Sequence, residues 1–565
     1  MMKRTLHLVM AFLLIATGVG STAHASDSVQ ARVTTSSTSF DGEWKESAGF
    51  NIKGNNYYRL RDLARNLSET TSQFDVTWNG KENAIEIVTG KAYFSDESEE
   101  IPSYYPSESY RAVRSTSKVI INGTKQEILA YTIEGSTYFQ LRDLATRIPF
   151  EVEYDSKEDR IAVYSQVPEH AYRAKTAFTA SESNVVESEL PRWQSQVKSN
   201  LIQNQDGTIS VIEASDKLTI ETYDAGYKLV GQKSLPFELP LFGAFYSGEK
   251  YNYVAFGQKN KEENDEKEVI RIVRYDKSFN RIDSVSIKGG PSYTVIPFDA
   301  GSGRMAESGN KLVFHTSRER YTSEDGLNHQ SQLTIIVDTS TMKVVNDLGK
   351  FQKNHVSHSF DQYVQFDGSS HVLVDHGDAY PRSIVLHKGS GSQYTEADLF
   401  KIPGAIGANA TGVSLGGFEL SASHYIVAMN SVDHSKVKSY TSYELVGLDL
   451  DQRDILLALL PRNSMTGAKT VTLARYVGSD KTTSIPKLVK LTDDKLMVLW
   501  QEFDREGRIG SLKYVYVNGE GTALGAIQTA PYFALSDCNP VLSGDKVVWY
   551  ADMKGNRTFY TIPVE

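Results

Sequence analysis

From residue 200 to the C-terminus, short apolar runs alternate with turn-forming residues, and helical periodicity is almost absent. Apolar runs of four to eight residues bounded by Gly, Asp, Asn or Ser are typical of β-strands. Clear runs occupy residues 253–256, 269–275, 311–314, 333–337, 425–428, 495–500 and 546–550. The pattern therefore predicts an all-β domain over residues 200–565.

These strands fall into groups. A turn that opens into a strand recurs seven times, at a spacing that is mostly 40–70 residues. The seven turns are Asp206-Gly207, Ser247-Gly248, Ser308-Gly309, Asp367-Gly368, Ser421-Ala422, Asp493-Asp494 and Ser543-Gly544. Four strands per group at this spacing predict the blades of a β-propeller, six to eight in number, with a large β-sandwich as the alternative. In a propeller, we expect the last strand, near residues 558–562, to close against the first blade.

Before residue 166 the chain contains an internal repeat. Residues 50–64 and 131–145 match at a constant offset of 81, and both contain the run Leu-Arg-Asp-Leu-Ala. In each copy a short alternating strand and a turn precede apolar positions at helical spacing, which start at Tyr57 and Tyr138. A hairpin of period-2 strands follows. The sequence predicts two α+β units, residues 26–95 and 96–165, joined to the β domain by a polar linker over residues 166–199.

The doubled pattern Gly-x-x-Tyr-aromatic-x-Leu-Arg-Asp-Leu-Ala resembles the copper amine oxidase N-terminal-like domain, a stalk-type α+β module of secreted Gram-positive proteins. The resemblance covers roughly residues 30–165 and implies a scaffold role. It does not imply amine oxidase activity, because the chain has no Asn-Tyr-acid triplet for a topaquinone and no His-x-His for copper. We therefore expect no cofactor. For the repeated Arg-Asp pairs at 61–62 and 142–143, we expect contacts that fix each helix on its sheet; a ligand groove shared by both copies is the alternative.

The first 25 residues have the three parts of a secretory signal peptide. Lys3 and Arg4 precede an apolar run over residues 6–15, and Ala23-His24-Ala25 supplies the small-x-small cleavage site. The run is shorter than the roughly 20 residues that a membrane helix needs. We expect cleavage after Ala25, and an uncleaved membrane anchor is the alternative. Cleavage would give a secreted protein without a membrane span. Any association with the cell wall would then be noncovalent.

The net charge and the cysteine content exclude some kinds of binding partner and of covalent link. The net charge is −10 and becomes −12 without residues 1–25, which argues against a nucleic-acid partner, since such binding needs a basic surface. The single cysteine, Cys538, cannot form an intrachain disulfide, and no lipid-anchor cysteine follows the apolar run. We expect Cys538 to be a small buried residue.

The densest group of chemically versatile residues lies between residues 355 and 424. Histidines and carboxylates could supply a general acid and base or contact a ligand. The weak catalytic candidates are Asp375, His376, Asp378 and Glu419, and the binding candidates are His355, His358, Arg382 and His424. Their spacing matches no metal signature, so no metal site is predicted, and residues that cap strand ends are the alternative interpretation.

Two functions are compatible with these features. The first is a binding or scaffold protein of the cell envelope or extracellular space, whose repeats hold a propeller that contacts a cell-wall glycan, a peptide or another surface protein. The second is a secreted hydrolase or lyase acting on polysaccharide, which needs two acids facing one another across a pocket; Asp375, Asp378 and Glu419 are its candidates. A purely structural wall protein would need no ligand.

Overall fold

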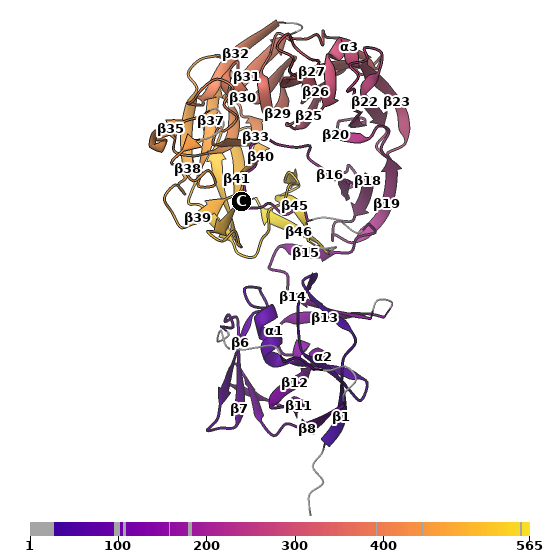
Figure 1. Cartoon of the computed structure of the whole chain (residues 1–565), viewed down its shortest axis with the longest axis vertical. Helices are drawn as coiled ribbons and strands as arrows, with labels where there is room; N and C mark the ends of the chain where they lie inside the picture. The colour runs from indigo at the N-terminus through magenta and orange to yellow at the C-terminus, as the bar shows by residue number, and fades with distance from the viewer. Residues whose placement is uncertain are drawn as a thin grey trace, which may run out of the picture. The chain divides into compact units, whose positions relative to one another are not determined.

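The computed structural model describes residues 28–94, 102–104, 109–156, 159–178, 183–390, 393–441, 445–553 and 556–564. The expected signal peptide and its cleavage site lie outside this range. The chain divides into two compact units, Met1–Gln166 and Val167–Glu565 (Figure 1). No described helix is long and apolar enough to cross a membrane.

The first unit is built around one closed six-stranded barrel to which both sequence repeats contribute. In barrel order the strands are β1 (Ser28–Val33), β4 (Gly49–Ile52), β5 (Asn55–Arg59), β12 (Ser136–Gln140), β11 (Ala130–Ile133) and β8 (Ser109–Arg114). In the β5–β12 pair Tyr58 stands opposite Phe139, and in the β1–β8 pair Gln30 stands opposite Arg111. Each of these pairs differs by 81 residues, so both copies are related by a local two-fold axis.

The rest of the first unit also mixes the two copies. Two four-stranded sheets each join two strands of one repeat to two strands of the other through a parallel pair, β7 with β9 and β14 with β2. The sheets consist of β10 (Thr124–Gln126), β9 (Lys118–Ile121), β7 (Ala84–Thr89) and β6 (Phe74–Asn79), and of β13 (Phe150–Asp155), β14 (Arg160–Ser165), β2 (Ser37–Phe40) and β3 (Glu43–Trp44). The two repeats therefore form one shared fold.

The helices of the repeats are shorter than their spacing predicts. They are α1 (Leu60–Asn66) and α2 (Leu141–Ala145), so Tyr57 and Tyr138 lie in strands instead. Both tyrosines are held in the barrel, where β5 pairs with β12, and this pairing overrides the helical period. Asp62 of α1 is fully buried and accepts hydrogen bonds from the Ala48 amide at 2.9 Å and from Arg59 Nε at 2.8 Å, which fixes the helix on the barrel.

The second unit is a β-propeller of seven four-stranded blades arranged around a common centre (Figure 1). Blades 1 to 3 are β16 (Ser199–Gln203), β17 (Ile209–Ala214), β18 (Lys217–Tyr223), β19 (Leu229–Pro236); β20 (Leu241–Ser247), β21 (Asn252–Gly257), β22 (Glu268–Tyr275), β23 (Arg281–Lys288); and β25 (Gly303–Ser308), β26 (Lys311–Arg320), β27 (Gln330–Asp338), β28 (Lys343–Val344). The connection from blade 2 to blade 3 contains α3 (Gly289–Ser292) and β24 (Thr294–Pro297), which pairs with β26.

Blades 4 to 7 repeat the same order of strands. They are β29 (Ser357–Asp367), β30 (Ser370–Ala379), β31 (Arg382–Ser390), β32 (Gln393–Lys401); β33 (Val413–Leu420), β34 (His424–Ser431), β37 (Asp454–Pro461), β38 (Lys469–Ala474); β40 (Lys487–Thr492), β41 (Lys495–Asp504), β42 (Ile509–Asn518), β43 (Gln528–Ala530); and β44 (Val541–Ser543), β45 (Lys546–Met553), β46 (Asn556–Pro563), β15 (Ala171–Ala174). Short insertions add η1 (His434–Lys436), β35 (Ser439–Tyr440), β36 (Leu445–Val446) and β39 (Lys481–Thr483).

The ring closes through a strand from before the first blade. β15 pairs antiparallel with β46, with Ala171 opposite Tyr560, and so completes blade 7 as its outer strand. The last strand therefore closes the ring within its own blade and not against blade 1, because the N-terminal side of the segment expected as a linker supplies the missing partner.

Each blade packs its two faces against its neighbours, which explains the continuous apolar runs in the sequence. Every residue of β21, for example, is buried. An apolar cluster occupies each of the seven blade interfaces. The cluster between blades 3 and 4 is the smallest of these, with five buried residues, and polar side chains fill the rest of that interface.

The first strands of the blades line the centre, and successive first strands touch one another from β20 to β44 and from β44 to β16. Their first hairpin turns lie at one end of the propeller. The turns between second and third strands, and the connections between blades, lie at the other end because the strands are antiparallel. We call the latter the connection end.

Candidate functional site

The residues predicted from the sequence do not converge on one site. Asp375 on β30 is fully buried and points toward blade 3, where its carboxylate lies 3.0 Å from His315 Nε2 and accepts a hydrogen bond from Ser359 Oγ at 2.6 Å. His315 Nδ1 lies 3.0 Å from Thr334 Oγ1. A hydroxyl, an imidazole and a carboxylate in line resemble a nucleophilic triad. All three are inaccessible, however, and they join β26 and β27 of blade 3 to blade 4.

His376 points to the other face of the same strand. Its Nε2 lies 2.9 Å from Thr411 Oγ1 in the interface with blade 5, and burial, followed by the charges of Arg453 and Arg382, lowers its pKa to about 3. Arg382 donates to backbone carbonyls, at 3.2 Å to Pro403 and at 2.9 Å to Ala410. Both side chains therefore act within the blade packing.

The remaining candidates are dispersed as well. Asp378 is buried and lies 3.1 Å from His358 Nδ1 at the connection end of blade 4. Glu419 and His424 flank the first hairpin turn of blade 5, at the opposite end of the propeller. Burial raises the pKa of Glu419 to about 7. His355 lines a second pocket at the connection end of blades 3 and 4, described below. Within the described residues no three His, Cys, Asp or Glu side chains are close enough to hold a metal ion.

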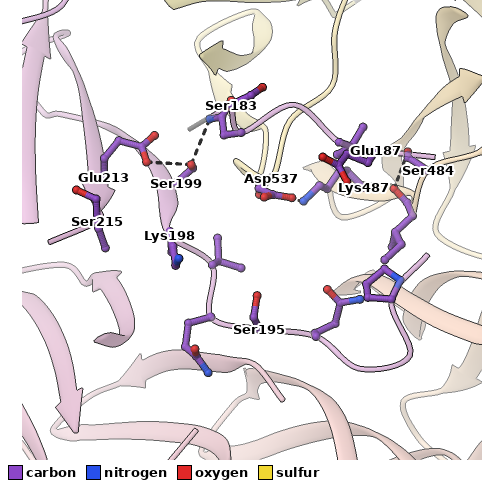
Figure 2. Close-up of a pocket in the computed structure, with 18 of the residues that line it drawn as sticks. Ser183, Glu187, Ser195, Lys198, Ser199, Glu213, Ser215, Ser484, Lys487 and Asp537 are labelled. Atoms are coloured by element: carbon purple, nitrogen blue, oxygen red, sulfur yellow. Dashed lines mark hydrogen bonds between the residues drawn. The ribbon is translucent and has the colours of Figure 1, made fainter. Parts of the chain in front are cut away.

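A large cavity lies at the hub of the propeller, at its connection end. Its volume is about 970 Å³. Its walls come from the first strands of several blades and from residues 183–199, which run between β15 and β16. Figure 2 shows Glu213 and Ser199 together on one side, with Lys487 and Asp537 on another. We call this space the hub cavity. None of the eight residues predicted from the sequence lines it.

Residues 183–199 are held in place by contacts with successive blades. Asn184 accepts a hydrogen bond from the Asp552 amide of blade 7 at 2.7 Å and donates to Ser199 Oγ at 3.2 Å. The Gln194 amide donates to the Phe360 carbonyl of blade 4 at 2.9 Å. Gln196 Nε2 donates to backbone carbonyls between blades 2 and 3. The segment thus follows the rim of the hub.

One wall of the hub cavity contains a buried ionic network where blade 7 meets blade 1. Arg557 donates two hydrogen bonds to Asp552, at 2.8 and 2.6 Å, and one to Glu221 at 2.5 Å. Its guanidinium also lies over the Tyr550 ring, 4.8 Å from the centroid. This network ties the two ends of the propeller chain together.

Glu213, beside this network, has an unusual protonation equilibrium. Burial raises its pKa to about 7, as does the nearby charge of Asp552, while hydrogen bonds from Tyr550 and Ser199 act in the opposite direction. Near neutral pH, both the protonated and the ionised form of the Glu213 carboxyl group are therefore populated.

The facing wall carries a second group of charges. Asp361 on β29 accepts a hydrogen bond from Ser302 Oγ at 2.6 Å, and burial raises its pKa to about 6. The Arg304 guanidinium stacks over the Tyr363 ring at 4.9 Å. Lys487 Nζ donates to the Asp537 carbonyl at 3.0 Å, and burial lowers its pKa. The cavity therefore offers donors, acceptors and carboxyl groups that change charge close to pH 7.

Glycine permits the close approach of strands at this wall. Gly416 on β33 lies against β40, and a Cβ there would come within 1.8 Å of the Pro486 carbonyl oxygen. Cys538, just before β44, is buried, and burial raises its pKa, so it offers no reactive thiolate.

The chain is similar in structure to several solved proteins at low sequence identity. No protein-family model matches the chain, and no curated protein matches it. Among solved structures, a protein of unknown function from Dyadobacter fermentans is similar at 11% identity, with a TM-score of 0.36 over 62% of this chain and 100% of that one. A GH43 protein from Bacillus licheniformis gives 10% identity and a TM-score of 0.26 over 52% and 57%. A Synechocystis apocarotenoid oxygenase gives 11% and 0.29 over 77% and 88%.

Proposed function

We propose that this chain is a secreted binding protein of the cell envelope or extracellular space, and that the hub cavity takes a polar segment of a wall glycan or of a peptide. The hub cavity itself is the observation on which this rests. Cavities of 300–1,000 Å³ with a few convergent polar groups are typical ligand sites. Among the lining residues, Lys487 can donate hydrogen bonds to hydroxyl and amide groups of such a segment and Glu213 can accept them.

The first unit is, in this proposal, a scaffold of the copper amine oxidase N-terminal-like kind. The repeated motif supports this, since its two copies occupy equivalent places on α1 and α2 and in the shared barrel. We expect no copper, topaquinone or amine oxidase activity in this unit.

Co-sedimentation of the full chain with purified peptidoglycan sacculi tests the binding function. Ser195 and Ser215 are exposed and line the hub cavity. The double variant S195W/S215W fills it with two indole rings and is expected to abolish sedimentation. The control S278W/S340W places the same rings in outer turns at the opposite end of the propeller and should sediment like the wild type. Equal sedimentation of both variants would refute the site.

A polysaccharide hydrolase or lyase is the second candidate, and one observation favours it. Glu213 and Asp361 both line the hub cavity, and the pKa values of both are raised toward neutrality, as a general acid requires. Asp375, Asp378 and Glu419 do not line this cavity. Release of reducing sugar from wall polysaccharide, lost in D361N and in E213Q but kept in D375N, would favour the enzyme; no release by the wild type would exclude it for that substrate.

A further inference from the structure

A second pocket, separate from the hub cavity, lies at the connection end of blades 3 and 4. Its volume is about 490 Å³. It lies where β26 ends, and the connection between the two blades and the turn after β30 complete its walls. The lining residues that matter here are Arg320, His329, Lys350, Phe351, His355 and Tyr380.

Two buried arginines on β26 form no salt bridge among the described residues, and one of them, Arg320, lines the pocket. Arg318 and Arg320 are two residues apart on β26, so their side chains leave the same face of the strand. They are only 1% and 4% exposed. In both, the Nε and Nη1 groups are buried without any hydrogen-bond partner among the described residues. Arg318 reaches only two backbone carbonyls, at 2.9 and 3.3 Å, through Nη2.

Such an arrangement is unfavourable for the protein alone. A buried charge without a counter-ion costs several kcal/mol, and two neighbouring like charges raise that cost. Burial, together with the charge of Arg320, lowers the pKa of Arg318 to about 9. Two carboxylates of the pocket relieve it only in part. Burial lowers the pKa of Arg320 and outweighs the charge of Asp325, which acts to raise it. Asp325 itself lies 2.7 Å from His329 Nε2 and accepts from the Leu327 amide, and Glu324 is exposed. The pocket therefore has donors for an anion that the chain does not supply.

Aromatic surfaces border the same donors. The Arg320 guanidinium stacks on the Phe351 ring at 4.6 Å, and the His355 ring meets Phe351 edge-on at 4.9 Å. Burial and the two guanidinium charges lower the pKa of His355 to about 4, so its imidazole is neutral at pH 7. Phe351 and Tyr380 are 57% and 70% exposed. Exposed rings beside hydrogen-bond donors suit the apolar face and the hydroxyl edge of a sugar.

We propose that this pocket binds an acidic saccharide, with the carboxylate of a uronic acid on the Arg320 guanidinium and the sugar ring against Phe351 and Tyr380. The fork of a guanidinium matches a carboxylate geometrically, and such charge-assisted bonds are the strong ones. This site is independent of the hub cavity, so it can exist whether or not that cavity binds a ligand.

Calorimetric titration of the full chain with a galacturonic acid trimer tests the proposal, with the neutral galactose trimer and inorganic phosphate as comparisons. The acidic trimer is expected to bind, more weakly at high salt, and the neutral trimer is not. R320M should weaken binding about 10- to 100-fold, the equivalent of one charge-assisted hydrogen bond. R508M, which changes an exposed arginine of blade 6, should leave it unchanged.

Further variants separate the two parts of the site. F351A should weaken the saccharide alone and leave any phosphate binding as it is, which distinguishes ring stacking from capture of an anion. Because R320M removes an unpaired buried charge, it should unfold at no lower temperature than the wild type; if it fails to fold, F351A and the salt dependence still decide. The proposal would be overturned by any of three results: the neutral trimer binds as well as the acidic one, phosphate binds but the acidic trimer does not, or R320M binds the acidic trimer with unchanged affinity.

Discussion

Replacing Arg557 with methionine tests how the propeller is closed. Arg557 is 1% exposed and donates to Asp552 on its own blade and to Glu221 on blade 1. The variant R557M leaves both carboxylates buried without a cation. Removing one partner from a buried ion pair costs about 3–5 kcal/mol. Since the urea dependence is roughly 3 kcal/mol per molar or more for a unit of this size, the midpoint should fall by about 1 M.

Urea unfolding of the full chain, followed through the fluorescence of the propeller's buried Trp549 and Trp500, measures this change. The matched control is R508M, because Arg508 pairs with Asp504 at 2.6 Å but its side chain is 66% exposed. An exposed pair contributes little, and the control should stay within about 0.5 kcal/mol of the wild type. If R557M also unfolds within about 1 kcal/mol of the wild type, the ionic network does not hold the closure.

Three further predictions also use urea unfolding of the full chain, followed by circular dichroism for variants of the first unit. Asp62 and Asp143 occupy equivalent repeat positions, but only Asp62 is fully buried, so D62A should lose about 2–4 kcal/mol and D143A no more than about 1 kcal/mol. Glu213 has a pKa of about 7 in the folded protein against 4.5 in the unfolded chain. Its contribution to the free energy of unfolding is therefore complete below pH 4.5 and is lost as the pH rises through 7. The stability of E213Q relative to the wild type should rise between pH 5 and 8, by at most about 3 kcal/mol. His376 has a pKa of about 3 in the folded protein against 6.5 in the unfolded chain. It therefore stabilises the fold above pH 6.5, and this stabilisation is lost as the pH falls toward 3. The loss of stability in H376N relative to the wild type should be smaller at pH 4 than at pH 7.

The propeller could be predicted because each blade repeats one local signal. All seven turns identified in the sequence, from Asp206-Gly207 to Ser543-Gly544, are the hairpins between the first and second strands of the seven blades. Such turns need particular residues whatever surrounds them, so they are visible in the chain. The closing strand β15 was not predicted, since four residues in a polar stretch form a strand only because β46 offers a free edge.

In the first unit as well, the local sequence pattern did not predict how strands pair, here between segments far apart in the chain. The offset of 81 identifies the repeat, but it does not say that the copies share a barrel. Pairing of Tyr58 with Phe139 depends on contacts between distant segments, and local periodicity carries no information about them. For this reason the helices were predicted to begin three residues too early.

The site was the least predictable part. Residues 355–424 were chosen as candidates because histidines and carboxylates are dense there. Successive residues of β30, however, point to opposite blade interfaces, as Asp375 and His376 do. The hub cavity collects single residues from separate blades, such as Glu213, Asp361 and Lys487. No spacing in the sequence links them. Their one shared feature is a charged residue in the first or second strand of a blade, and other strands of the propeller show that as well.

Hydrogen–deuterium exchange of the full chain, with and without soluble peptidoglycan fragments, tests the central claim most directly, because it locates bound ligand without any substitution. If the hub cavity is the binding site, the fragments will slow exchange in peptides covering residues 183–199 and 484–487, and peptides at the first hairpin turns will not change. Unchanged exchange at residues 183–199 while the fragments protect another part of the propeller would contradict the account.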